Sequence, residues 1–254
     1  MRIATFNING ITRRLPNLLA WLAATTPDIV CLQELKAEQD AFPQAVLHQA
    51  GYHSIWVGQK SWNGVAILSR SKPVPTRTTL PGDPQDKQAR YIEAAIEGVL
   101  VACLYAPNGN PQPGPKFDDK RAWTERLIAH AETLHAAGIP AILAGDFNIV
   151  PTPADIYNER SWKKNALIQP EPRAQFARLL AQGWTDALRH LHPDAIPWTF
   201  WSVFRDSYAR DAGLRIDHLL LSPKAARRLH TAGVDRETRG HPNASDHAPT
   251  WIEL

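Results

Sequence analysis

Cysteine is scarce in this sequence. Only two of the 254 residues are cysteine, and Cys31 and Cys103 each stand inside an apolar run. They lack the close spacing that marks a thiolate zinc site or a redox-active pair. We therefore expect two small, buried hydrophobic side chains, and a protein that works in a reducing compartment, the cytoplasm.

Long hydrophobic runs are also missing. No uncharged apolar stretch reaches the length of a membrane span, and "MRIATFNING" starts at once with a strand pattern rather than a secretory signal. We expect no membrane partner. The sequence also lacks the P-loop, the dinucleotide-binding glycines and the GxSxG of serine esterases. Nucleotide-driven transfer and serine esterase chemistry therefore have no support.

Short apolar runs bounded by Gly, Pro, Asn or Asp recur along the whole chain. They predict strands at 2–8, 28–34, 64–70, 91–97, 99–107, 139–148, 198–204, 215–222 and 247–254. Apolar residues at helical spacing predict helices around 15–22, 123–134 and 176–180. No Gly/Ser-rich linker divides the chain, so we expect a single domain, 1–254, of the α/β class with more than one sheet.

Polar residues stand where six of these predicted strands meet their loops. They are Asn7 and Asn9, Glu34, Tyr105 and Asn108, Asp146 and Asn148, Asp217, and Asp246 with His247. Taken singly, most have an ordinary explanation as turn residues or solvated side chains. Asp217 is harder to explain, because a carboxylate inside an apolar run must find a partner or shift its pKa. Ligand sites in α/β sheets lie at strand ends, so we interpret the set as one site.

The composition of this set indicates its chemistry. Scattered carboxylate and amide oxygens suit a hard cation, Mg²⁺ with Mn²⁺ as a substitute. Such an ion polarises a phosphoryl oxygen, while a carboxylate and a histidine handle protons. The formal net charge of +3 permits a polyanionic partner without requiring one. The residues by themselves predict metal-assisted hydrolysis of a phosphoester.

A series of blocks resembles the exonuclease III family of abasic-site endonucleases. The blocks are "FNING", "CLQELK", "GQKSWNGVAILSR", "YAPNG", "LAGDFNI", "DIYNERSW", "GWTDALRHLHP", "GLRIDHLLLS" and "SDHAP". Their order and separation span nearly the whole chain. The resemblance implies a four-layered α/β sandwich, in which two packed mixed β-sheets are flanked by helices. It also implies a monomer that acts on double-stranded DNA carrying abasic sites or blocked 3′ ends.

The resemblance implies a metal-binding part of the site. Glu34 matches the metal ligand of the larger superfamily, and Asn7 and Asp246 match residues beside the metal. Asn9 lies next to them and is expected to bind substrate.

A second part is expected to hold and cleave the phosphate. The residues that match phosphate-holding positions are Tyr105, Asn108 and Asn148. Asp146 resembles the proton-handling acid of the family. His247 resembles the imidazole that contacts the scissile phosphate, and Asp217 is expected to support it.

Loops around the site are expected to select the substrate. Phe200 and Trp201 stand where family aromatics line a pocket for an extrahelical abasic sugar. The chain has Ser202 and Val203 where family members commonly carry Asp-Tyr. The basic residues expected to contact the DNA backbone are Lys60, Lys116, Arg160, Lys163, Lys164 and Arg205.

Two other functions are alternatives to a DNA-repair nuclease. A superfamily phosphatase acting on an inositol phosphate or a lipid headgroup would use the same chemistry on a different substrate. A nucleic-acid-binding module without catalysis would belong to another class, but every expected catalytic position holds a competent residue. The resemblance therefore favours a DNA-repair nuclease that cuts 5′ to abasic sites, and implies 3′-5′ exonuclease, 3′-phosphatase and 3′-phosphodiesterase activity.

Overall fold

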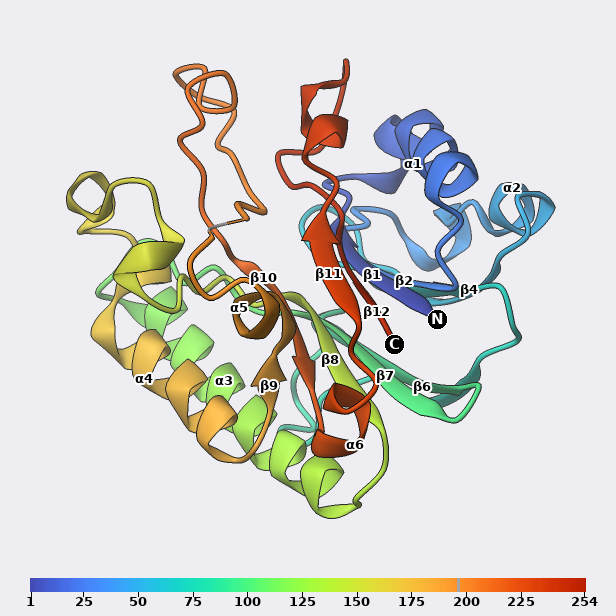
Figure 1. Ribbon diagram of the computed structural model, residues 1–254, viewed down its shortest axis with the longest axis horizontal. Coiled ribbons are helices and arrows are strands. Elements are labelled where there is room, and N and C mark those ends of the chain that lie inside the picture. The colour runs from blue at the N-terminus through green and yellow to red at the C-terminus, as the bar shows by residue number, and fades with distance from the viewer. Residues whose placement is uncertain (196) are drawn as a thin grey trace.

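Twelve strands form two six-stranded sheets in this computed structural model, which describes residues 1–195 and 197–254 (Figure 1). The first sheet has the order β11-β12-β1-β2-β4-β3 and contains β1 (Arg2–Asn7), β2 (Ile29–Gln33), β3 (His53–Val57), β4 (Val65–Ser69), β11 (Thr231–Val234) and β12 (Thr250–Glu253). The second has the order β5-β6-β7-β8-β10-β9 and contains β5 (Val74–Arg77), β6 (Tyr91–Ile96), β7 (Val99–Tyr105), β8 (Ala141–Asp146), β9 (Thr185–Asp186) and β10 (Asp217–Leu221). Each sheet is mixed, with one parallel pair, β1–β2 or β7–β8.

Helices cover the outer faces of both sheets. On the first sheet lie α1 (Ile11–Thr25) and α2 (Gln44–Gln49), and on the second lie α3 (Pro115–Ala136) and α4 (Pro170–Ala181). Two short helices, α5 (Ala187–Leu191) and α6 (Pro223–Ala226), follow β9 and β10. The predicted four-layered α/β sandwich is confirmed. Among the described helices, none has both the length and the apolarity needed to span a bilayer.

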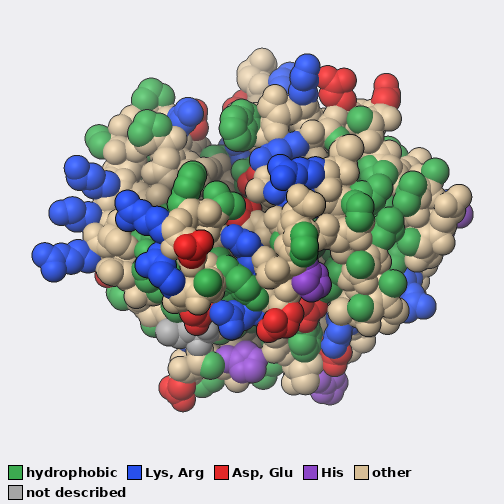
Figure 2. Space-filling view, turned by 90° about the horizontal axis from the view of Figure 1, so that it is seen from above, with side chains coloured by type: hydrophobic (Ala, Val, Ile, Leu, Met, Phe, Trp, Pro, Cys, Tyr) green, Lys and Arg blue, Asp and Glu red, His purple; other side chains and the backbone are tan. Residues whose placement is uncertain are grey.

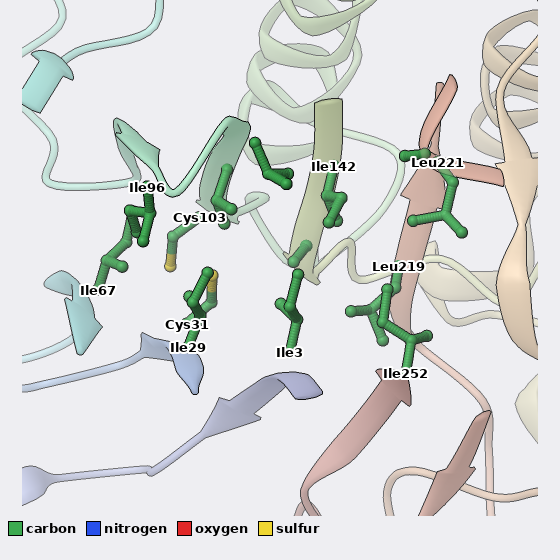
Figure 3. Close-up of a cluster of buried hydrophobic side chains, with 14 of the residues drawn as sticks. Ile3, Ile29, Cys31, Ile67, Ile96, Cys103, Ile142, Leu219, Leu221 and Ile252 are labelled. Carbon is green, nitrogen blue, oxygen red and sulfur yellow. The ribbon is translucent and has the colours of Figure 1, made fainter. Parts of the chain in front are cut away.

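The core between the sheets is built largely from alternate residues of the central strands. Figure 3 shows Ile3 and Cys31 of the first sheet facing Cys103 and Ile142 of the second. Both cysteines are free and fully buried, as predicted. Along the central strands, the residues that alternate with these core residues face outward and pack under the helices. Every second side chain of a central strand therefore points into the space between the sheets.

Sequence patterns located the central strands and missed the edges. The strands that went unpredicted, β3, β5, β9 and β11, are the four edge strands. β5 is exposed at every position, so it carries no apolar run to detect. The three predicted helices are confirmed as α1, α3 and α4.

The predicted strand at 198–204 is wrong. Phe200 forms only isolated bridges, to Leu214 and His247. The N–H of Trp201 donates to the carbonyl of Asp246 at 2.9 Å. The segment passes between the residues that precede β10 and those that precede β12, and it forms no continuous ladder with either. Its aromatic residues favour a strand, but tertiary contacts override that preference.

Gly145 is required by close packing in β8. A Cβ at this position would lie 1.9 Å from the backbone oxygen of Leu104 in β7. We expect Gly145→Ala to lower the free energy of unfolding by at least about 2 kcal/mol, because the parallel pair must move apart. Gly98→Ala is the control, because nothing lies within 4 Å of its Cβ and its φ of +80° costs about 1 kcal/mol. Equal urea stabilities for the two variants would contradict this reading of β8.

Candidate active site

Polar strand-end residues converge at one end of the sandwich. Asn7 has the same parity in β1 as Ile3, so its side chain points between the sheets. Tyr105 and Asp146 end β7 and β8 and lie opposite each other in parallel register. Asp217 begins β10 and pairs with Asp146 in antiparallel register. Alternation and register therefore bring these four side chains together.

The amide of Asn7 connects the two sheets. Its Nδ2 donates to Glu34 Oε1 and to Asp146 Oδ2, each at 2.9 Å. Its Oδ1 accepts the backbone N–H of Asn9 at 3.0 Å. Because both ends of the amide are engaged, Asn7 bridges two carboxylates in this structure. Its place beside a metal, which the resemblance implies, stays a prediction.

Glu34 stands at the centre of a second set of contacts. The Tyr105 hydroxyl donates to its Oε1 at 2.9 Å, and Lys36 Nζ pairs with its Oε2 at 3.1 Å. Lys36 also donates to Asn9 Oδ1 at 2.6 Å, and Asn9 Nδ2 donates to Asp246 Oδ1 at 2.9 Å. The carboxylates of Glu34 and Asp246 are thus linked through one ammonium and one amide.

Tyr105 is held as a neutral phenol. Burial, reinforced by the Glu34 and Asp146 carboxylates, keeps the pKa of Tyr105 well above its ordinary value. The guanidinium of Arg90 lies over the tyrosine ring, 4.9 Å from its centroid, and donates to the Tyr105 carbonyl at 3.2 Å. Tyr105 is therefore a hydrogen-bond donor throughout the neutral pH range.

His247 and two aspartates form the proton-handling part of the site. His247 Nδ1 donates to Asp217 Oδ2 at 2.8 Å, and its Nε2 lies 3.7 Å from Asp146 Oδ2. Burial alone would lower the pKa of His247, but the Asp217 charge and hydrogen bond outweigh it and raise the pKa to about 10. Burial, with repulsion from Asp217, raises the pKa of Asp146 to about 7. The imidazole is thus a cation at neutral pH, and Asp146 can exchange a proton there.

Two asparagines line the site beyond Asp146. Asn148 adopts a left-handed backbone conformation, with φ 49°, and its N–H donates to Asp146 Oδ1 at 2.9 Å. Its Nδ2 donates to the Ala106 carbonyl at 2.8 Å, and Asn108 Nδ2 donates to its Oδ1 at 3.2 Å. The predicted phosphate-holding residues Asn108 and Asn148 are therefore in direct contact.

The oxygen donors fit a hard divalent cation. Glu34 and Asp246 offer carboxylate oxygens, and both side chains reach the surface. In the described part of the chain, Asp146, Asp217 and His247 also present ligand atoms within 4.8 Å of one another. Two of these atoms are already hydrogen-bonded to each other, and a protonated imidazole repels a cation. We expect the ion at Glu34, with Asp246 beside it, as the resemblance implies.

Of the two aromatic residues predicted to line a pocket, Phe200 borders the site and Trp201 is buried away from it. The ring of Phe200 lies 4.9 Å from that of His247, so it borders the site. Trp201 has no exposed surface, because its ring packs against Tyr208 and its indole N–H donates to Asp211 at 3.3 Å. Neighbouring side chains of an extended segment point in opposite directions. The structure therefore does not support the predicted pocket contact of Trp201.

Several residues of the site were missed from sequence. Lys36 lies two residues after Glu34, and a cation so near an expected ligand was a usable signal. Lys120 precedes Trp123 by three residues, so helical spacing was a usable signal that it lies on the buried face of α3. Burial lowers the pKa of Lys120 to about 7. Phe204 is 73% exposed in the loop after Phe200, and no pattern distinguished it from a buried aromatic.

Known proteins are similar to this chain in sequence. The sequence profile of the Endonuclease/Exonuclease/phosphatase family matches residues 4–247. The chain is 35% identical to exodeoxyribonuclease III of Haemophilus influenzae, over the full length of both. It is 31% identical to the DNA repair nuclease APEX1 of Danio rerio, over all of this chain and 82% of that one. The chain therefore belongs to the Endonuclease/Exonuclease/phosphatase family, and the resemblance to exonuclease III is confirmed.

Solved structures agree. The 3′-5′ exonuclease NExo of Neisseria meningitidis superposes with a TM-score of 0.97 at 41% identity, covering 100% of this chain and 99% of that one. An AP endonuclease of Archaeoglobus fulgidus gives 0.96 at 33% identity, with the same coverage. The Neisseria 3′ phosphatase NExo has also been solved with a product DNA hairpin.

The state of His247 can be measured directly. With a pKa of about 10 in the folded protein, the imidazolium should persist through neutral pH and be lost only as the pH rises through 10. Asp217→Asn removes the main stabilising charge, and we expect the ring of that variant to titrate below about 8. NMR of the ring nitrogens in metal-free protein measures both values. A wild-type ring that titrates near 6.5 would refute this assignment.

Proposed function

We propose that this chain is a Mg²⁺-dependent DNA-repair nuclease that hydrolyses the phosphodiester 5′ to an abasic site in double-stranded DNA. We infer that it also removes 3′-phosphates, 3′-phosphodiesters and 3′-terminal nucleotides. The observation that carries the proposal is the meeting of Glu34, Asp146, Asp217 and His247 at one end of the sandwich. The relatives named an exodeoxyribonuclease, a 3′ phosphatase and an AP endonuclease support the choice of substrate.

The proposed reaction is in-line attack of water on the phosphorus, which breaks the bond to the 3′ oxygen. Asp146 accepts a proton from the attacking water, and the departing 3′ oxygen takes up a proton from solvent. The Asn7 amide and the Asn148 N–H hold the two oxygens of Asp146. The Nε2–H of His247 faces Asp146 and offsets the charge that develops on a non-bridging phosphate oxygen. Asn148 and Tyr105 supply further neutral donors.

A divalent cation held by Glu34 and Asp246 would polarise the phosphoryl group and offset its charge. We infer Mg²⁺, with Mn²⁺ as a substitute, because the donors are hard oxygens. The buried free cysteines support work in a reducing compartment, the cytoplasm. Action as a monomer stays a prediction.

Positive side chains surround the proposed site. Figure 2 looks down on this end of the molecule, where Lys and Arg gather around a hollow that holds acidic side chains. The exposed basic residues predicted to contact the DNA backbone are Lys60, Lys116, Arg160, Lys163, Lys164 and Arg205. Such a rim can bind phosphates on both sides of a cleavage point.

A nicking assay tests the proposal. A labelled duplex with one abasic site is compared with an intact duplex, a 3′-phosphate end and an inositol phosphate, each with and without Mg²⁺. We expect Mg²⁺-dependent cutting 5′ to the abasic site and release of the 3′-phosphate. Glu34→Gln and His247→Ala should each lower turnover by at least about 100-fold, because a ligand or a charge-stabilising donor is lost.

Matched controls are available at a distance from the site. Glu97→Gln in the turn between β6 and β7, and His230→Ala before β11, both change exposed residues and should retain full activity. Release from the inositol phosphate alone would favour the phosphatase alternative. Unchanged turnover of Glu34→Gln or His247→Ala would remove that residue from the reaction.

The loop after Phe200 offers an apolar contact to DNA. Val203 and Phe204 are 64% and 73% exposed, beside the exposed Arg205. We expect Phe204→Ala to raise KM for the abasic duplex about 10-fold with little change in kcat, because stacking on a base contributes about 1–3 kcal/mol. Steady-state kinetics checks this, with Val74→Ala, 61% exposed on β5, as the control. A Phe204 variant with wild-type KM would place the loop outside the interface.

A further inference from the structure

Lys120 is a buried lysine on α3 whose amino group pairs with no carboxylate in the described part of the chain. Its side chain is fully buried, and among the described residues it forms no ion pair within 4 Å. Its Nζ donates instead to three backbone carbonyls, those of Asn148 at 2.6 Å, Asn108 at 3.1 Å and Ala166 at 3.5 Å. A buried ammonium is costly unless its hydrogens are satisfied, so three acceptors from three segments indicate a dedicated arrangement.

Two of the three segments that Lys120 contacts carry predicted site residues. Asn108 follows β7 and Asn148 follows β8, and these two residues are proposed to hold the phosphate. Ala166 begins the 3-10 helix η4 (Ala166–Ile168). Asn148 has its backbone in the left-handed region, which is unfavourable without support. The ammonium binds the carbonyl of that residue while the Asn148 amide faces Ala106 and Asn108.

The path of the lysine side chain depends on Gly109. A Cβ on Gly109 would lie 2.6 Å from Lys120 Cδ, and the φ of Gly109 is +86°. Only a residue without a side chain lets the aliphatic part of Lys120 pass beneath the loop and reach the carbonyls. Gly109 and Lys120 therefore act as a pair in the geometry of this loop.

We propose that Lys120 is a positioning residue, which fixes the backbone of Asn148 and so holds its side chain, between Ala106 and Asn108, in the proposed phosphate site. The inference rests on the proposed function and deepens it. Lys120 touches no substrate atom in this arrangement, and its effect on the reaction passes through Asn148. The contact with Asn148 also explains why a lysine occupies the buried face of a largely apolar helix.

A double-mutant cycle tests the proposal. Lys120→Met keeps the length of the side chain and removes the ammonium. We expect it to lower kcat/KM for the abasic duplex at least about 30-fold in the wild-type background, and less than about 3-fold in the Asn148→Ala background. Single-turnover kinetics with excess enzyme gives both values, and circular dichroism checks folding at the assay temperature. Lys224→Met on α6, exposed and remote, is the control and should be fully active.

A purely structural role would give another result. Loss of folded protein would reduce activity by the same factor in both backgrounds, and that outcome overturns the proposal. If wild-type protein cuts abasic or 3′-blocked DNA while Lys120→Met matches it, this inference alone fails. If wild-type protein cuts neither substrate, the proposed function fails and this inference with it.

Gly109→Ala provides an independent test if Lys120→Met does not fold. The new Cβ would displace the lysine, so we expect the same loss of activity, again abolished in the Asn148→Ala background. Gly114→Ala is the matched control, because its φ is also positive but its Cβ would meet only the Pro111 oxygen at 3.7 Å. Equal activities for the two glycine variants would overturn the proposal.

Discussion

Repulsion between carboxylates is the constraint on which this site depends. The strand ends bring Glu34, Asp146 and Asp217 together, and burial, reinforced by repulsion from Asp217 and Glu34, raises the pKa of Asp146 to about 7. The Asn7 amide bonds two of these carboxylates, and the His247 imidazolium bonds the third. These contacts offset part of the repulsion and leave an electronegative site suited to a cation. Burial and the same crowding give one carboxyl group, that of Asp146, a pKa near neutrality.

The two-sheet scaffold makes this crowding possible. Asn7 comes from the first sheet and Asp146 from the second, so neither sheet alone could build the site. The side chains stand on strands packed through a shared core, which limits their movement relative to one another. Loops supply the other residues around the site, including Asn148 in a left-handed turn and the exposed Phe204. One scaffold can therefore serve several phosphoester substrates, with the loops selecting among them.

Much of the fold was predictable because central strands are buried on both faces. The runs that became β1, β2, β7, β8 and β10 have nearly continuous apolar patterns, and turns bound them clearly. Edge strands such as β5 face solvent and carry no such pattern. The segment at 198–204 has aromatic residues typical of a strand, but its partners are distant in sequence and only the packed structure reveals them.

By itself, the sequence determined which residues are chemically competent, because carboxylates, amides and an imidazole stand where strands end. It also determined their parity, so Asn7, Tyr105 and Asp146 had to share faces with core residues. The tertiary structure decided the pairings: Asn7 between two carboxylates, His247 against Asp217, and Trp201 buried beside the site. Hydrogen bonds and burial depend on distances between segments far apart in the chain, such as Asn7 and Asp146, 139 residues apart, or Asn9 and Asp246, 237 residues apart, and no local pattern encodes such distances.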